Sequence, residues 1–196
     1  MNIYGYGEDA LTLWALKNKL SEIIPEDEIN EECKIFYRPS FGRGGKGKTN
    51  FGEMDFIIIT SQKIYLGESK WDKLGKIKRN NLELARNQIL RHKILSEYIR
   101  LWYPEKCWSS FDKHKEIFKN KFKKDVPGKK TDLAVNLMTL LAEIGSLKTI
   151  FNVLLYFHNG SGGLDNNIKK YDDVDFLIKN INYSHEKEIP KNLIQL

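Results

Sequence analysis

The chain has 196 residues, of which 41% are hydrophobic and 12% aromatic, and its formal net charge is +6. This apolar content suffices for a buried core, which excludes a disordered tail or a fibre. No apolar run approaches the ~20 residues of a membrane-spanning helix, and the N-terminal segment lacks the basic and apolar regions of a signal peptide. We therefore expect one domain over residues 1–196 in the cytoplasm, without a membrane partner, where Cys33 and Cys107 would be reduced and mostly buried thiols.

The charge is distributed unevenly along the chain. Residues 1–35 carry three basic and eight acidic side chains, whereas residues 70–130 carry eighteen Lys or Arg and seven Asp or Glu. Such an asymmetry favours a basic face that meets a polyanion, most often a nucleic acid. The alternative is that these charges only solvate ordinary helices, and charge by itself leaves both interpretations open.

The first half of the chain alternates between helical and strand patterns. The predicted elements are a helix from about Glu8 to Ile24 that ends at Pro25, a short strand at Lys34–Arg38, a glycine-rich basic loop from Pro39 to Asn50, strands at Glu53–Thr60 and Lys63–Lys70, and a long helix from about Lys78 to Trp102. The polar pair Ser61 and Gln62 joins the two later strands as a hairpin loop.

The second half is less distinctive. Its predicted elements are a basic helix at Phe111–Phe122, an apolar helix at Thr131–Ile144 capped by Gly145, a buried strand at Lys148–Phe157, a loop at Asn159–Gly163, and a segment at Val174–Ile181 whose pattern fits a strand or a helix. This order of elements predicts an α/β domain with a mixed sheet.

One motif in the basic loop matches a phosphate-binding pattern. The residues from Gly42 to Thr49 read G-x-x-x-x-G-K-S/T. In that motif a helix leaves the loop, and its N-terminus and backbone amides bind phosphate. Here a strand-like run follows, so the context disfavours a nucleotide-binding loop, although a nucleotide-binding protein remains one of the alternatives.

The hairpin brings charged residues together at its open end. With a two-residue loop at Ser61 and Gln62, Thr60 pairs with Lys63, and the side chains of one face alternate with period two. Counted outward, the facing pairs are then Ile59 and Ile64, Ile57 and Leu66, Asp55 and Glu68, and Glu53 and Lys70. This face therefore changes from aliphatic near the turn to charged at the far end.

Asp55 and Glu68 would form a pair of like charges beside an apolar core. Directly opposed carboxylates destabilise a sheet unless a cation compensates them, and a divalent cation that prefers oxygen ligands does so. Lys70, two residues beyond Glu68, could steady a developing negative charge or orient a water molecule. The alternative is a solvated strand end with an ion pair between Glu53 and Lys70.

Two segments of the hairpin resemble the PD-(D/E)XK nuclease superfamily. The run Gly52-Glu53-Met54-Asp55-Phe56-Ile57-Ile58, followed by Ile64-Tyr-Leu-Gly-Glu68-Ser69-Lys70, is similar to its D…(E/D)-x-K core. Gly7-Glu8-Asp9-Ala10 resembles the first-helix segment whose Glu joins the metal site in that superfamily. Gln88 matches a Gln that RecB-like members carry on the next helix, but the Tyr one turn later is missing here. The resemblance covers about Tyr6 to Arg100.

The resemblance implies a restriction-endonuclease-like αβββαβ core over about residues 6–102, with additional helices and a strand in residues 103–196. It also implies hydrolysis of DNA with Mg²⁺, for which Mn²⁺ can substitute. Asp55, Glu68 and the Ser69 carbonyl would bind the metal, with Glu8 completing its shell and Glu53 and Gln88 supporting it. Lys70 would position the attacking water or help to deprotonate it.

The same resemblance assigns phosphate contacts to basic residues of the two segments around the hairpin. These residues are Arg43, Lys46, Lys48, Lys73, Lys76, Lys78 and Arg79. The main alternative is a nucleic-acid-binding module of the same fold that has lost catalysis. An enzyme that cuts both strands of a duplex would favour a homodimer. The histidines His92, His114, His158 and His185 have no ligand spacing and are interpreted as ordinary surface or core residues.

Overall fold

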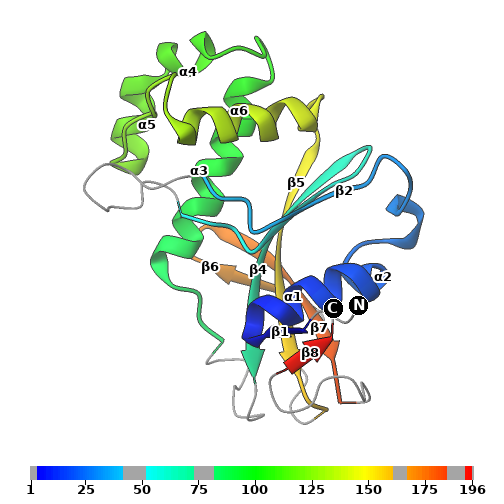
Figure 1. Cartoon of the computed structure of the whole chain (residues 1–196). Coiled ribbons are helices and arrows are strands. Elements are labelled where there is room, and N and C mark those ends of the chain that lie inside the picture. The colour runs from blue at the N-terminus through cyan, green and yellow to red at the C-terminus, as the bar shows by residue number, and fades with distance from the viewer. Residues whose placement is uncertain (1–3, 42–51, 73–81, 161–166, 185–192, 196) are drawn as a thin grey trace.

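The computed structural model describes residues 4–41, 52–72, 82–160, 167–184 and 193–195 (Figure 1). The strands are β1 (Tyr4–Tyr6), β2 (Lys34–Tyr37), β3 (Phe56–Ile59), β4 (Lys63–Asp72), β5 (Thr149–His158), β6 (Ile168–Tyr171), β7 (Val174–Asn182) and β8 (Leu193–Gln195). The helices are α1 (Gly7–Asn18), α2 (Leu20–Ile23), a 3-10 turn η1 (Glu26–Glu28), α3 (Arg86–Trp102), α4 (Ser109–Lys113), α5 (Lys115–Phe122) and α6 (Asp132–Ile144).

A six-stranded mixed sheet in the order β2-β3-β4-β5-β7-β6 forms the centre of the molecule. The strands β2, β3 and β4 are antiparallel to one another, β4, β5 and β7 are parallel, and β6 is antiparallel to β7. The parallel step from β4 to β5 needs a long connection, which α3 to α6 supply. The α/β class with a mixed sheet is thus confirmed, and the undecided segment at residues 174–181 is the strand β7.

Helices cover both faces of the sheet because its central strands are apolar on both sides. Phe56, Ile58 and Tyr65 pack against α1 and α2 on one face. Ile57 and Leu66 alternate with them and pack against α3 and the smaller helices on the other face (Figure 1). This two-sided burial is typical of a strand in the middle of an α/β sheet.

Several predicted boundaries are wrong. The first helix breaks at Lys19 into α1 and α2, and the basic helix breaks at His114 into α4 and α5. The long helix begins at Arg86 rather than near Lys78, because Leu82 and Leu84 are buried against β5 and β7 from a non-helical segment. The strand at Glu53–Thr60 is shorter than predicted, and Cys107 is exposed rather than buried.

The two ends of the described chain meet beside α1. There β1 and β8 form an antiparallel pair, and Ile194 of β8 is buried in the cluster that contains the core residues of α1. None of the helices in the described ranges is long and apolar enough to cross a membrane.

Candidate functional site

The hairpin register predicted from the sequence is confirmed. Ile59 pairs with Ile64 and Ile57 with Leu66, and the Thr60 backbone N–H donates to the Lys63 carbonyl at 2.9 Å. The last pair of the ladder joins Phe56 to Gly67. Asp55 therefore stands just beyond β3, next to Glu68, as its backbone N–H bond to the Gly67 carbonyl at 3.2 Å also indicates.

Strand β4 extends well beyond the end of β3, and no other strand of the described residues pairs with that part of its edge. Two carboxylates take the place of such a strand. Asp55 Oδ2 accepts a hydrogen bond from the Ser69 backbone N–H, and Glu8 Oε2 accepts one from the Trp71 N–H, both at 2.7 Å. The Ser69 carbonyl points to the same side as its N–H. Glu8, Asp55 and a backbone carbonyl therefore gather along one edge.

Helix α1 is tied to this edge by a second contact. The hydroxyl of Thr12 donates to Ser69 Oγ at 2.8 Å, and both side chains are buried. Glu8 lies one helical turn before Thr12 and thus reaches the same strand. The sequence-based placement of Glu8 beside the hairpin is consistent with this geometry.

Glu68 lies on the opposite face of β4 from Ser69 and is fully buried. Arg91 donates to both of its oxygens, from Nε to Oε1 at 2.6 Å and from Nη2 to Oε2 at 2.5 Å. Gln88 donates to Oε2 at 2.7 Å, and His92 Nε2 lies 3.3 Å from Oε1. Burial alone would raise the pKa of Glu68, but the bonds from His92 and Arg91 lower it below its usual value.

The pKa of Asp55 is shifted in the opposite direction. Burial, followed by the neighbouring negative charge of Glu68, raises its pKa to about 7. Burial also raises the pKa of Glu8, although the hydrogen bond from Trp71 and the charge of Lys70 oppose that rise. The three carboxylates and Lys70 therefore form one electrostatically coupled group around the outer half of β4.

Glu53 does not lie opposite Lys70, so the alternative of an ion pair between them is wrong. The chain turns away from β4 before Asp55, and Glu53 instead bridges to Ser40 and pairs with Arg38 Nη2 at 2.8 Å. Arg38 also forms an ion pair with Asp9 of α1. Glu53 is exposed in this arrangement and helps to anchor Arg38.

Sequence reasoning missed Arg91 and His92, which hold Glu68, and Asn152, whose Oδ1 lies 2.8 Å from His92 Nδ1. Arg91 and His92 follow Gln88 at the i+3 and i+4 positions of one helix face, and this spacing could have grouped them with it. The remaining sequence-predicted residues lie outside the described residues. They are Arg43, Lys46 and Lys48 with the rest of the Gly42–Thr49 motif, and Lys73, Lys76, Lys78 and Arg79.

The oxygen donors at the β4 edge suit a divalent cation. The Asp55 carboxylate and the Ser69 carbonyl are hard ligands of the kind that Mg²⁺ takes, and a cation would offset the burial and the repulsion by Glu68 that raise the pKa of Asp55. Glu68 could join them only when Arg91 releases it. Within the ranges the structure describes, no three His, Cys, Asp or Glu side chains are grouped so that they could hold a metal ion.

Comparison with known proteins adds no assignment at this point: no family model matches the chain, and no curated protein matches it in sequence.

Proposed function

We propose that this protein is a metal-dependent nuclease that hydrolyses phosphodiester bonds of DNA, built on a restriction-endonuclease-like core. The observation that carries the proposal is the coupled pair Asp55 and Glu68 at the end of the hairpin, with the pKa of Asp55 raised to about 7. Strongly shifted pKa values in neighbouring acids are typical of functional sites. Asp55, whose ionised form is disfavoured by burial and by Glu68, would be an unfavourable residue merely to end a strand.

In this proposal Asp55, Glu68 and the Ser69 carbonyl hold Mg²⁺ or Mn²⁺. The bound ion would polarise the scissile phosphate and lower the pKa of its water. Lys70 positions or deprotonates the attacking water. The residue that follows it on β4, Trp71, is fixed by Glu8 through the backbone N–H. Glu8 thereby acts as a positioning residue for the part of β4 that carries Lys70.

A second candidate is a nucleic-acid-binding module without catalysis. The bidentate contact of Arg91 with Glu68 favours it, because the guanidinium already supplies the positive charge that a metal would bring. In this alternative Arg91 is a permanent structural partner of Glu68, and no cation takes its place.

Cleavage assays distinguish the two candidates. We expect the protein to cut supercoiled plasmid or single-stranded DNA with Mg²⁺ or Mn²⁺ and not with chelator. Asp55→Asn keeps an acceptor for the Ser69 N–H but loses the charge, so its cleavage rate should fall by more than the roughly 100-fold that loss of an outer-shell partner costs. The exposed Glu22→Gln variant is the matched control and should retain full activity.

The other possible outcomes of these assays also distinguish the two candidates. Binding without cleavage in any metal would support the inactive module. Full activity of Asp55→Asn, or activity in chelator, would overturn the proposed mechanism. Linear plasmid as the first product would indicate that both strands are cut together, as expected of a homodimer.

A further inference from the structure

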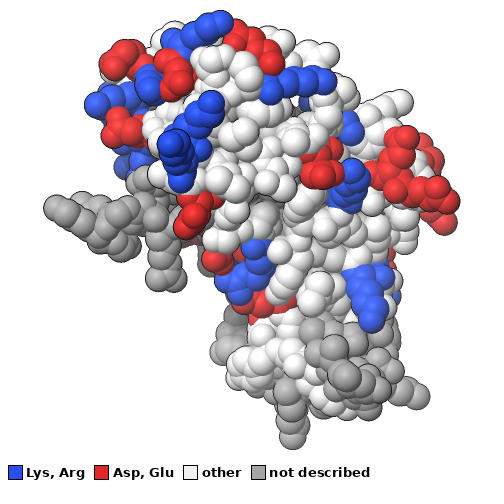
Figure 2. Space-filling model, turned by 45° about the horizontal axis from the view of Figure 1, so that its top comes forward, with Lys and Arg blue, Asp and Glu red and all other residues white. Residues whose placement is uncertain are grey.

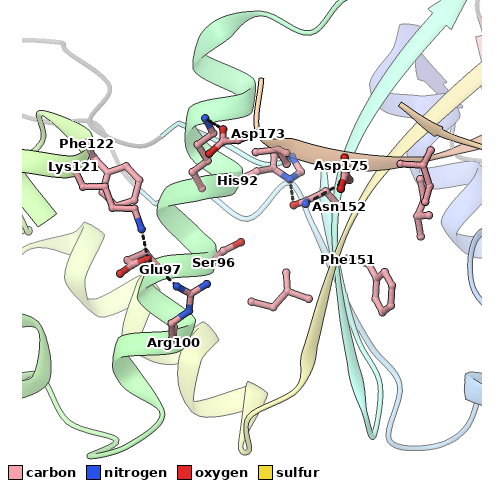
Figure 3. Close-up of a pocket in the computed structure, with 15 residues that line it drawn as sticks. His92, Ser96, Glu97, Arg100, Lys121, Phe122, Phe151, Asn152, Asp173 and Asp175 are labelled. Atoms are coloured by element: carbon pink, nitrogen blue, oxygen red, sulfur yellow. Dashed lines mark hydrogen bonds and ion pairs between the residues drawn. The ribbon is translucent and has the colours of Figure 1, made fainter. Parts of the chain in front are cut away.

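A groove lies between α3, the end of α5 and the turn that joins β6 to β7, and it encloses about 680 Å³. We call it the α3–α5 groove. Its lining includes the basic residues Arg86, Lys93, Lys121, Lys123 and Lys124. A second cavity of about 500 Å³ adjoins it and shares Lys93 and Lys121 (Figure 3).

The acidic side chains of the groove are fewer than the basic ones. Asp172 and Asp173 of the β6–β7 turn are the acids in its lining. Lys93 pairs with Asp173, and Lys121 pairs at 2.8 Å with Glu97 of the adjoining cavity (Figure 3). The remaining three cations are Arg86, Lys123 and Lys124, and the structure gives them no ion pair among the residues that it describes. The groove therefore keeps an excess of positive charge.

The outer surface of α4 and α5 is different. Figure 2 shows Lys and Arg side chains there mixed with Asp and Glu. The mixture reflects local ion pairs, which are Lys113 with Glu105, Lys115 with Asp112 at 2.7 Å, and Lys119 with Asp125 at 3.3 Å. These three lysines of the segment 70–130 are therefore balanced locally.

Lys123 occupies an unusual backbone conformation. Its φ is 55° and its ψ 32°, in the left-handed region, at the C-terminal end of α5. Glycine or asparagine is the common choice at such a position, and another L-residue costs about 1 kcal/mol there. A long basic side chain thus stands in the groove at a position where glycine would be more stable.

Helix α3 separates the groove from Glu68. Gln88 and Arg91 point to Glu68, whereas Arg86 and Lys93 line the groove. An α-helix with its side chains is about 10–12 Å across. A ligand in the groove would therefore lie about one helix width from the proposed cleavage site.

We propose that the α3–α5 groove binds one strand of the nucleic-acid substrate next to the point of cleavage, an inference that rests on the proposed function. Arg86 and Lys93 are about 10 Å apart along the helix, so the basic lining extends over more than one phosphate of a bound strand. The volume is that of a site for a small molecule, so a few nucleotides enter and a duplex does not. Leu90 and the exposed edge of the largely buried Phe122 form the apolar part of the lining beside the lysines.

The test compares two double variants with the same loss of charge. The groove variant is Lys123→Gly with Lys124→Ala, in which glycine also relieves the backbone at residue 123. The control is Lys115→Ala with Lys119→Ala, on the outer side of the same helix. Binding of a fluorescent oligothymidylate is measured by anisotropy in chelator over a series of salt concentrations, with thermal unfolding to check the fold.

The groove variant should bind more weakly, and the slope of log affinity against log salt should become shallower by about 0.7 for each lost phosphate contact, or about 1.4 in total. The control should keep the wild-type slope to within about half of one contact. Equal slopes for the two variants would overturn the strand-binding inference. It would also be overturned if thymidine monophosphate or duplex DNA competed as strongly as the oligonucleotide.

A second readout separates this inference from the proposed function. Cleavage of bis(p-nitrophenyl) phosphate with Mn²⁺ requires the metal site. This substrate is too small to reach the groove. The groove variant should cleave it at the wild-type rate. If the wild-type protein cleaves nothing while only the groove variant loses oligonucleotide binding, the nuclease proposal fails and the groove stands as a binding site. A groove variant that loses cleavage of this small ester would contradict a role in strand binding alone.

Discussion

Glu68 and Asp55 are neighbouring acids with opposite environments. Glu68 has no solvent exposure, yet its pKa is lowered, because the interactions with His92 and Arg91 outweigh the effect of burial. Asp55 accepts a backbone N–H from Ser69, and its pKa is raised by burial and by Glu68. An acid pair with pKa values pushed apart lets one group stay ionised while the other exchanges a proton or a cation.

The first prediction at this scale concerns Arg91. Arg91→Met should lower the free energy of unfolding by about 3–5 kcal/mol in chelator, because Glu68 keeps a buried charge without its bidentate partner. Mn²⁺ should restore part of this loss, since the carboxylate becomes free to bind a cation and a ligand that binds only the folded state stabilises it. Urea unfolding with chelator and with Mn²⁺ measures both effects.

Arg100→Met is the matched control for this experiment. Arg100 is exposed on the same helix and lies 3.6 Å from Glu97, so the change should cost no more than about 0.5 kcal/mol. An Arg91→Met variant as stable as the wild type would contradict the role given to Arg91. Stability that Mn²⁺ leaves unchanged would count against a metal site at Glu68.

The second prediction concerns the pH dependence of stability. The pKa of Asp55 is about 7 in the folded state and near 3.8 when unperturbed, so between these values the folded state binds more protons than the unfolded state. Asp55 should therefore lower the free energy of unfolding of the wild type by up to about 4 kcal/mol as pH rises from about 4 to 7. Asp55→Asn lacks the titration, so its stability relative to the wild type should rise over this window.

Urea unfolding of both proteins in chelator at a series of pH values gives the difference directly, because the other titrating groups are common to both. Mg²⁺ should reduce the pH dependence of the wild type, since a cation favours the ionised carboxylate. A stability difference that stays constant from pH 4 to 7 would show that the pKa of Asp55 is not raised.

At the scale of elements, the unequal lengths of β3 and β4 create the candidate site. Strand β4 has ten residues and β3 has four, so the backbone N–H groups of Ser69 and Trp71 extend past the ladder. Unpaired backbone donors in a partly buried strand need acceptors. Asp55 and Glu8 supply them, which fixes both carboxylates at the strand edge.

Gly67 provides a prediction for the hairpin. A Cβ at this position would lie 2.0 Å from Cζ of Phe56, the residue that pairs with it across the ladder. Gly67→Ala should therefore destabilise the fold by about 1–3 kcal/mol, because the buried Phe56 ring must move. Thermal or urea unfolding measures the loss.

Two further variants test the cause. Phe56→Leu combined with Gly67→Ala should be less destabilised than the sum of the single changes, since the smaller side chain makes room for the methyl group. Gly128→Ala is the control, because its Cβ would lie 3.6 Å from Thr131 Cγ2, an ordinary contact. Strict additivity of the two changes would rule out the proposed clash with Phe56.

At the scale of the whole molecule, the chain ends hold α1 against the sheet. Strands β1 and β8 pair beside α1, and buried Ile194 packs with its core residues. Helix α1 is thereby fixed where Glu8, in its first turn, reaches β4. On the other face α3 presents Gln88 and Arg91 to Glu68 and lines the α3–α5 groove. Two helices on opposite faces thus approach the outer half of one strand.

The sequence by itself determined the α/β class and the register of the β3–β4 hairpin. Both depend on local signals: the alternation of apolar residues and a two-residue turn at Ser61 and Gln62. Because register follows from the turn, the neighbouring positions of Asp55 and Glu68 could be predicted as well. The same local signals left residues 174–181 undecided, since a buried strand and a buried helix have similar composition.

Only the tertiary structure decided what surrounds these two acids. The partner of Glu68 is Arg91, 23 residues away, and Glu8 meets Trp71 across 63 residues. Such contacts follow from how helices dock on the sheet, and many docking arrangements satisfy the same pattern of apolar residues. Glu53 shows the limit of extrapolation: the chain leaves the ladder at Asp55, and Glu53 pairs with Arg38 instead of Lys70. A period of two predicts facing residues only while the backbone remains in the ladder, and the packing of the whole chain determines where the ladder ends.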